Sequence, residues 1–184
     1  AEVLRCFPLV RVQKHSRGDH VSVLRLRRLI LQLRDQKRVI GMSGVIFLLG
    51  FVLAGLDFRF GWTSVPGWLI AAASVVFLVS YGMYGEVMRE NAWISRTVEI
   101  QEGQKVVSTG LYGIVRHPMY SVTLVLFLTM PLVLGSIYAF VIFLVYPFII
   151  AKRIRNEEQV LTAELDGYAA YKEKVRWRLL PFIW

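Results

Sequence analysis

The residues best suited to chemistry lie in a polar stretch between apolar runs. The stretch covers residues 103–120, reads GQKVVSTGLYGIVRHPMY, and contains His117, Pro118 and Tyr120 at its end. Pro118 fits the first turn of a helix, where its missing N–H is no loss, so the motif predicts the start of an apolar helix. Helix N-termini present unpaired N–H groups and a partial positive charge, which suit an anion. We therefore expect this stretch to form the floor of a cofactor site.

A second set of polar side chains follows the last apolar run. Its members combine carboxylates with cationic and phenolic groups: Arg153, Glu157, Glu158, Tyr168, Tyr171, Arg176 and Arg178. Carboxylates suit ribose hydroxyls, an amino group or a sulfonium, whereas Arg, His and Tyr suit a carboxylate. Together with Tyr112, Arg116, His117 and Tyr120, this set fits a zwitterionic cofactor that carries a positive charge.

Several common site types lack their motifs. The chain has no GxGxxG, GxxxxGK[ST], HExxH or GxSxG, which removes the usual support for dinucleotide, P-loop, zincin and hydrolase sites. The single cysteine, Cys6, excludes an internal disulfide and a cysteine-based zinc site. We expect no bound metal.

The composition is that of a membrane protein. Of the 184 residues, 55% are hydrophobic and 13% aromatic, too apolar for an ordinary soluble domain. The net charge of +9 could indicate nucleic-acid binding. Basic residues beside apolar spans are explained better by topology and anionic lipid headgroups, so we expect membrane lipids and no nucleic acid as partners.

The apolar pattern predicts an all-α integral membrane helical bundle. Residues 1–38 hold ten Lys and Arg with interleaved apolar residues, which predicts a basic amphipathic N-terminal segment on the membrane surface. Residues 39–184 then form a single membrane-embedded domain, with a first span at about 39–56 and a second at about 66–88.

Residues 118–151 are apolar almost throughout. This run is too long for one transmembrane helix and slightly too short for two full ones. Pro131 and the turn at 134–136 divide this run, so it predicts a C-terminal helical hairpin and a total of about four transmembrane helices. The second hairpin helix is expected to continue to Asp166, with Gly167 as its C-cap. A short amphipathic segment at 168–177 follows.

Charge counting orients this bundle. Lys and Arg number ten in 1–38, one in the 57–66 loop, four in 89–117 and seven from 152 onward, which places 21 of 22 on one face. The positive-inside rule makes that face cytoplasmic. The cofactor-binding segments and both termini are therefore expected on the cytoplasmic side.

The second half of the chain resembles the isoprenylcysteine carboxyl methyltransferase family and its relatives among phospholipid N-methyltransferases. The resemblance runs from about residue 91 to 184, and its pieces are GQKVV at 103–107, GLY at 110–112, RHPMY at 116–120, Arg153 before Glu157-Glu158, Gly167-Tyr168 with Tyr171, and 175–181. It implies a membrane-integral enzyme that uses S-adenosylmethionine without a Rossmann domain.

The resemblance also implies roles for individual residues. His117, Tyr120, Glu157 and Glu158 are expected to line the cofactor pocket. The cofactor-binding set is completed by Gln104, Val106, Val107, Gly110 and Tyr112, with backbone around 104–107 at the adenine end. Arg153, Glu158 and Arg176 form the expected catalytic set: Arg153 braces the site, and Arg176 or Arg178 lies near the acceptor. The run Lys174 to Arg178 departs from the Arg-Val-Pro-like pattern of the carboxyl methyltransferases.

The expected reaction is direct in-line methyl transfer to a lipidic or prenylated acceptor, with carboxylate O-methylation favoured. A carboxylate is already nucleophilic at neutral pH, whereas an amine or phenol needs a base such as His117 or Glu158. The acceptor is expected to enter from the bilayer. Two alternatives remain open: a membrane-embedded, NADPH-dependent reductase of the sterol type, and a non-catalytic membrane receptor or assembly protein.

Overall fold

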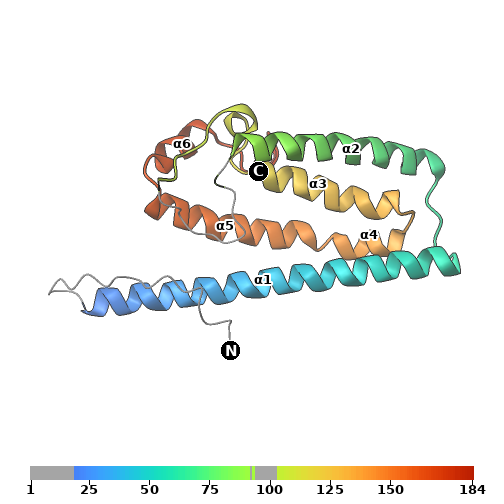
Figure 1. The fold of residues 1–184 in the computed structure, drawn as a ribbon, viewed down its shortest axis with the longest axis horizontal. Helices are drawn as coiled ribbons and strands as arrows, with labels where there is room; N and C mark the ends of the chain where they lie inside the picture. Colours follow the sequence, from blue (N-terminus) through green and yellow to red (C-terminus); the bar gives the residue numbers. More distant parts are fainter. Residues whose placement is uncertain (1–18, 92, 94–102) are drawn as a thin grey trace. The chain divides into compact units, whose positions relative to one another are not determined.

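The computed structural model describes residues 19–91, 93 and 103–184. The first 18 residues of the predicted amphipathic segment and residues 94–102 of the polar stretch lie outside the described part. The described elements, drawn in Figure 1, are α1 (Asp19–Phe60), α2 (Gly67–Glu90), the short 3₁₀ helix η1 (Gly110–Gly113), α3 (Pro118–Val133), α4 (Ile137–Phe143), α5 (Tyr146–Glu164) and α6 (Tyr168–Lys174).

The chain divides into two compact units, Ala1–Asp35 and Gln36–Trp184. In the first unit the structure describes the beginning of α1. The second unit contains the rest of α1 and all other elements, and it is the unit that carries the site.

Among the described residues, three helical stretches are long and apolar enough to cross a membrane: Val39–Phe60, Gly67–Glu90 and Ile137–Glu164, the last of which comprises α4 and α5. A fourth apolar helix, α3, has 16 residues. At 1.5 Å per residue α3 is about 24 Å long, shorter than a typical hydrocarbon core of about 30 Å. The predicted all-helical membrane bundle is confirmed, with α3 as its shortest apolar helix.

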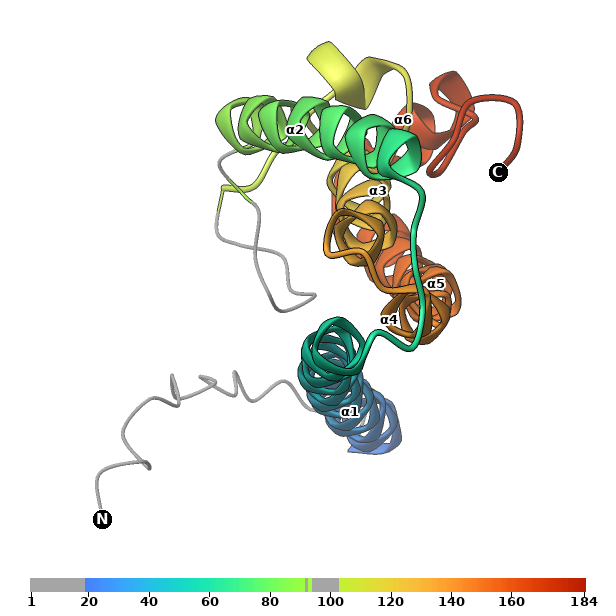
Figure 2. The ribbon, with the colours of Figure 1, turned by 90° about the vertical axis from the view of Figure 1, so that its right-hand side faces the viewer.

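The C-terminal hairpin forms as predicted. α3 ends at Val133, Gly135 turns the chain with a φ of 74°, and Ser136 caps α4 by accepting a hydrogen bond from the Ala139 amide. Figures 1 and 2 show α3 packed between α2 and α5. α3 therefore has protein on both sides, and its first turn lies within reach of α5.

The second arm of the hairpin differs from the prediction of one continuous helix. It is broken at residues 144–145, between α4 and α5. Pro147 explains the break because it has no N–H to donate to the Phe143 carbonyl one turn earlier. The arm ends at Glu164 with Leu165 as C-cap, so the predicted end at Asp166 and the predicted cap at Gly167 were wrong. Gly167, with a φ of 83°, instead precedes α6 as its N-cap.

Aromatic side chains fill the centre of the second unit. Phe127 packs edge-on against Phe47 and Tyr146, with ring centroids 4.6 and 4.5 Å apart. Phe143 is buried beside them and lies against Gly50 of α1. This cluster joins α1 to the hairpin.

A buried carboxylate holds the loop after α1 against the hairpin turn. Asp57 accepts hydrogen bonds from the Thr63 amide at 2.7 Å, the Thr63 hydroxyl at 2.6 Å and the Ser136 hydroxyl at 2.5 Å. Buried polar groups are expected to be paired in this way.

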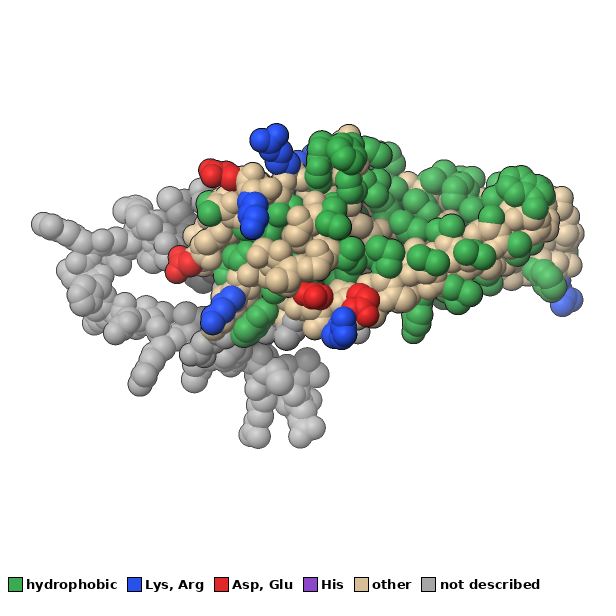
Figure 3. All heavy atoms as spheres, turned by 90° about the horizontal axis from the view of Figure 1, so that it is seen from above, with side chains coloured by type: hydrophobic (Ala, Val, Ile, Leu, Met, Phe, Trp, Pro, Cys, Tyr) green, Lys and Arg blue, Asp and Glu red, His purple; other side chains and the backbone are tan. Residues whose placement is uncertain are grey.

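The surface seen from the α2 side separates by chemistry. In Figure 3 hydrophobic side chains cover most of its length, and most charged side chains gather toward one end. Exposed apolar residues on α2 include Trp68, Val75, Leu78 and Val79. Such a surface suits contact with lipid, with the charged end in water.

Candidate functional site

The site is built where the start of α3 meets the C-terminal segment. The amides of Arg116 and His117 donate hydrogen bonds to the carbonyls of Trp177 at 2.8 Å and Arg178 at 2.9 Å. Val115 and Trp177 form a parallel β-bridge. The Ser121 hydroxyl donates to the Leu179 carbonyl at 2.5 Å, one turn further into α3. These contacts fix residues 175–179 alongside the RHPMY motif.

A buried carboxylate lies at the centre of the site, held by two arginines. Glu158 Oε1 accepts a hydrogen bond from Arg116 Nε at 2.7 Å, and Oε2 accepts one from Arg178 Nε at 2.9 Å. Arg116 also donates to the carbonyls of Val175 and Arg176 at 2.7 and 2.9 Å. Glu158 is 4% exposed and Arg116 7%. The carboxylate therefore joins α5 to the loop before α3 and to the C-terminal segment.

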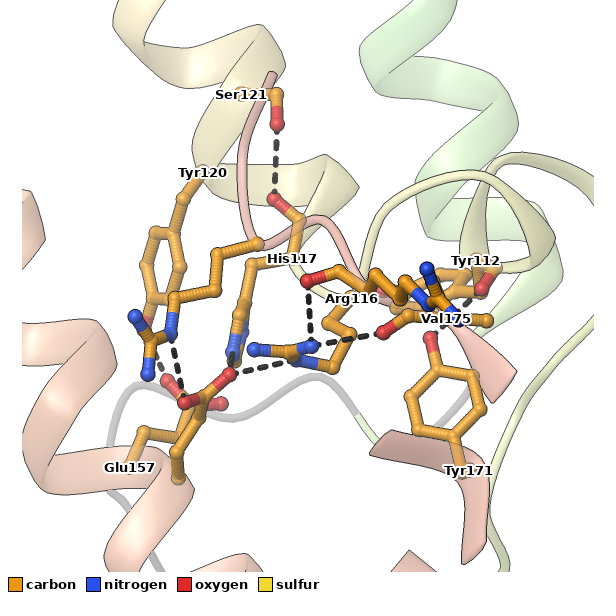
Figure 4. A network of polar contacts seen from close by, with 11 residues as sticks. Tyr112, Arg116, His117, Tyr120, Ser121, Glu157, Tyr171 and Val175 are labelled. Carbon is orange, nitrogen blue, oxygen red and sulfur yellow. Dashed lines mark hydrogen bonds and ion pairs between the residues drawn. The ribbon is translucent and has the colours of Figure 1, made fainter. Parts of the chain in front are cut away.

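His117 is the N-cap residue of α3, directly before Pro118, and is buried. Its Nε2 lies 3.4 Å from Glu158 Oε1 without forming a hydrogen bond. Figure 4 shows the imidazole facing the carboxylates of α5, with the Arg116 guanidinium beside it. A buried imidazole nitrogen without a hydrogen bond calls for a specific explanation.

A second polar group lies one turn into α3. The Tyr120 hydroxyl donates to Glu157 Oε2 at 2.6 Å and accepts a hydrogen bond from Arg153 Nε at 2.7 Å. The Arg153 guanidinium also lies 5.6 Å from the centre of the Tyr120 ring, within cation–π range. Four expected site residues, His117, Tyr120, Arg153 and Glu157, thus meet between α3 and α5 (Figure 4).

Tyr112 and Gly110 shape the loop before the motif. The Tyr112 hydroxyl accepts a hydrogen bond from the Asn91 side chain at 2.9 Å, and its carbonyl accepts one from the Tyr171 hydroxyl at 2.7 Å. Burial, reinforced by the nearby Tyr112, raises the pKa of Tyr171 to about 12, so this phenol stays a donor at neutral pH.

Gly110 has a φ of 52°, and a Cβ there would press on the Glu90 side chain at 3.0 Å. These contacts hold the loop in place.

The remaining expected cofactor residues lie around this loop. Val106 packs on the α6 cluster, which consists of Leu165, Tyr168, Tyr171 and Val175. Val107 packs instead on a cluster of α2 and α3 residues that includes Tyr112. Gln104 lies in the same segment, which is neither helix nor strand, and has an interaction partner of its own.

The two candidate acceptor arginines differ. The Arg176 side chain is exposed, and it is the residue's backbone carbonyl that contacts Arg116. Arg178 is half-buried, contacts Glu158, and lies over the Trp184 ring at 5.1 Å. Arg178 is thus the arginine of this pair that the structure brings to the site.

Arg116 and Tyr168 were among the polar groups expected around the cofactor but were given no individual role, and both are buried beside the site. The sequence signal for Arg116 was its place directly before His117 in the RHPMY motif. The sequence contains no signal that Arg116 would pair with Glu158, which lies 42 residues further along the chain. The pairing depends on the hairpin that brings α5 beside α3.

Comparison with known families identifies this arrangement. The model of the isoprenylcysteine carboxyl methyltransferase (ICMT) family matches residues 69–163, more than half of the chain. The match runs from the start of α2 through most of α5 and includes the RHPMY motif and Glu157-Glu158. A search of curated proteins found no match.

Proposed function

The chain belongs to the isoprenylcysteine carboxyl methyltransferase family and is a membrane methyltransferase, and on that premise we propose that it transfers a methyl group from S-adenosylmethionine to a lipidic acceptor. The observation that carries the proposal is the convergence of His117 and Tyr120 of α3 on Arg153 and Glu157 of α5. The proposed site lies at the cytoplasmic membrane face, where the positive-inside rule places it.

The residues present fit this cofactor. His117 Nε2, which lies 3.4 Å from Glu158 Oε1 without a hydrogen bond, can bind a carboxylate, and the Glu157 carboxylate can bind an ammonium or lie near a sulfonium. The amides of the first turn of α3 add a partial positive charge at the same place. The site therefore offers both signs of charge to a zwitterion.

When bound, S-adenosylmethionine supplies an electrophilic methyl group. The protein's part is to hold donor and acceptor in line, with the reacting atoms about 3–3.5 Å apart, because positioning supplies much of the acceleration. We assign binding to His117, Tyr120 and Glu157. We assign Arg153 and Glu158 a positioning role, since Arg153 orients the Tyr120 hydroxyl and Glu158 has both oxygens occupied by arginines.

The proposed acceptor is a carboxylate on a lipid or prenylated molecule that enters from the bilayer. A carboxylate needs no base, and no step then requires a proton to leave. Arg178 is the better-placed cation to attract such a group, because it contacts Glu158 whereas the Arg176 side chain is exposed. The apolar surface of the helices would accommodate the lipid chain.

Calorimetry on detergent-purified protein tests the cofactor. Wild-type protein is expected to bind S-adenosylmethionine saturably, and His117→Ala and Glu157→Gln are each expected to weaken binding by tenfold or more, equivalent to about 1.4 kcal/mol. Tyr138→Phe serves as the control, because Tyr138 is exposed on α4 and outside the site.

Absence of binding by well-folded wild-type protein would overturn the proposed cofactor. Saturable binding of reduced nicotinamide in its place would favour the reductase. Binding that is unaffected by both His117→Ala and Glu157→Gln would place the cofactor elsewhere. A subsequent assay with a prenylcysteine and with a phospholipid amine, each as acceptor, separates carboxylate from amine methylation.

A further inference from the structure

α6 carries a buried phenol that has no hydrogen-bond partner. Tyr168 is 4% exposed. Within the described residues, its hydroxyl and His117 Nε2 are the two buried side-chain polar atoms without a partner. A buried hydroxyl in this state costs free energy, so in a native structure it calls for a specific explanation.

The residues that pack with Tyr168 in its hydrophobic cluster offer one polar atom, the Tyr171 hydroxyl. Leu165 and Val175 share its cluster, and Leu161 and Val106 pack against it. The Tyr171 hydroxyl is already bonded to the Tyr112 carbonyl. Tyr168 is therefore the one phenol of this cluster that is free to bind a ligand.

Tyr168 is also close to the charged centre of the site. Burial raises the pKa of the Tyr168 hydroxyl, and the Glu158 carboxylate raises it further. The phenol is consequently protonated at neutral pH and acts as a donor. The charged groups that suit an amino acid moiety, His117 and Glu157, belong to α3 and α5, whereas α6 offers apolar walls and one donor.

We propose that the Tyr168 hydroxyl donates a hydrogen bond to the nucleoside portion of the bound cofactor, whose flat ring has apolar faces and a polar edge. This inference rests on the proposed function. It adds Tyr168 to the binding residues and divides the ligand between two places: its charged end lies between α3 and α5, and its ring lies against α6.

The segment that packs against the Tyr168 cluster contains glycines in left-handed conformations. Val106 lies between Gly103 and Gly110, whose φ angles are 77° and 52°. L-residues rarely adopt these angles, so both positions use the conformational freedom of glycine. A shift of the intervening residues, which include Val106, would change the packing against the Tyr168 cluster.

The experiment compares two ligands on one variant. Tyr168→Phe keeps the ring and removes the hydroxyl alone. We expect it to weaken binding of both S-adenosylhomocysteine and 5′-methylthioadenosine by about fivefold to tenfold in calorimetry, as expected for one lost hydrogen bond. 5′-Methylthioadenosine lacks the amino acid part, so an equal loss for the two ligands locates the contact at the nucleoside.

Thermal stability of the ligand-free protein supplies the structural control. Because the hydroxyl has no partner, Tyr168→Phe is expected to melt at or above the wild-type temperature. Tyr138→Phe is the matched control and should leave affinity and melting unchanged.

Three results would overturn the inference. In the first, Tyr168→Phe binds both ligands as tightly as wild type. In the second, only S-adenosylhomocysteine binding is weakened, which would place the contact at the amino acid end. In the third, the variant melts well below wild type, which would make the hydroxyl structural. If wild-type protein binds neither ligand, the proposed function itself fails, and that outcome is distinct from the other three.

Discussion

At the scale of single residues, Glu158 shows how a group expected to touch the cofactor can instead hold the site together. Its two oxygens are taken up by Arg116 and Arg178, and these contacts connect α5 with the motif and the C-terminal segment. His117 and Tyr120 depend on this framework for their positions. In the proposed site, His117 and Tyr120 bind the cofactor, whereas the neighbouring Glu158 holds them in position.

Removal of the Glu158 carboxylate should destabilise the protein strongly. In Glu158→Ala the buried Arg116 guanidinium loses its counter-charge, and breaking a buried pair in this way costs about 3–5 kcal/mol. The measurement is unfolding in detergent, followed by circular dichroism. The expected loss is far larger than the loss of cofactor contact alone would produce.

The exposed pair Arg89–Glu86 on α2 provides the matched control. Its side chains are 76% and 57% exposed, so Arg89→Ala should change stability by no more than about 1 kcal/mol. Equal and small effects of Glu158→Ala and Arg89→Ala would show that the Glu158 carboxylate does not support the fold.

At the scale of helices, α1 packs against α4 through a glycine. A Cβ at Gly50 would overlap the Phe143 ring, which is itself fully buried between Phe47 and Tyr146. The ring has little room to move, because protein interiors are closely packed. A small residue here thus allows α1 to approach the hairpin.

Gly50→Ala is therefore expected to destabilise the protein by about 1–3 kcal/mol, the usual cost of adding a methyl group to a filled core. Gly44→Ala in the same helix is the control, since a Cβ at Gly44 has no atom within 4 Å. Gly44→Ala should leave the melting temperature unchanged or raise it, because alanine favours a helix over glycine. If both variants melt alike, the close packing at Gly50 has no energetic role.

The sequence predicted the helices better than it predicted the breaks between them. Long apolar runs and the turn at 134–136 located α2, α3 and the hairpin. The interruption at 144–145 was missed although Pro147 is visible in the sequence, because a proline can also lie within a helix, as Pro131 does in α3, and the sequence alone does not say which proline breaks it. The end of α5 was misplaced by two residues because glycine can occupy a left-handed position on either side of a helix end.

Most of the site residues could be proposed from the sequence, but their contacts could not. The motif and its resemblance pointed to His117, Tyr120 and Glu157, which the structure brings together. Glu158 binds two arginines, and the Tyr168 hydroxyl has no hydrogen-bond partner. Both features depend on side chains that are 10 to 42 residues apart in sequence and that meet only after the hairpin and α6 have formed. Local pattern contains no information on such pairings.

At the scale of the whole molecule, the distribution of charge relative to the helices determines which side of the membrane holds the site. The last turn of α1 and the loop after it contain one cation, Arg59, and the segments that form the site contain most of the others outside residues 1–38. Orientation of a membrane protein follows the excess of Lys and Arg in its cytoplasmic segments. The loop at 61–66 should therefore face away from the cytoplasm, and α6 should face it.

Cysteine labelling tests this topology. Cys6 is the only native cysteine, so single cysteines can be placed in a Cys6→Ser background. Ser64 and Lys174 are exposed positions in the 61–66 loop and in α6. In sealed inverted vesicles, whose cytoplasmic face points outward, a membrane-impermeant maleimide should label Lys174→Cys directly and Ser64→Cys only after detergent is added. The reverse pattern would place the site on the other side, and direct labelling of both positions would contradict the crossing by α2, because α2 separates the loop from the site.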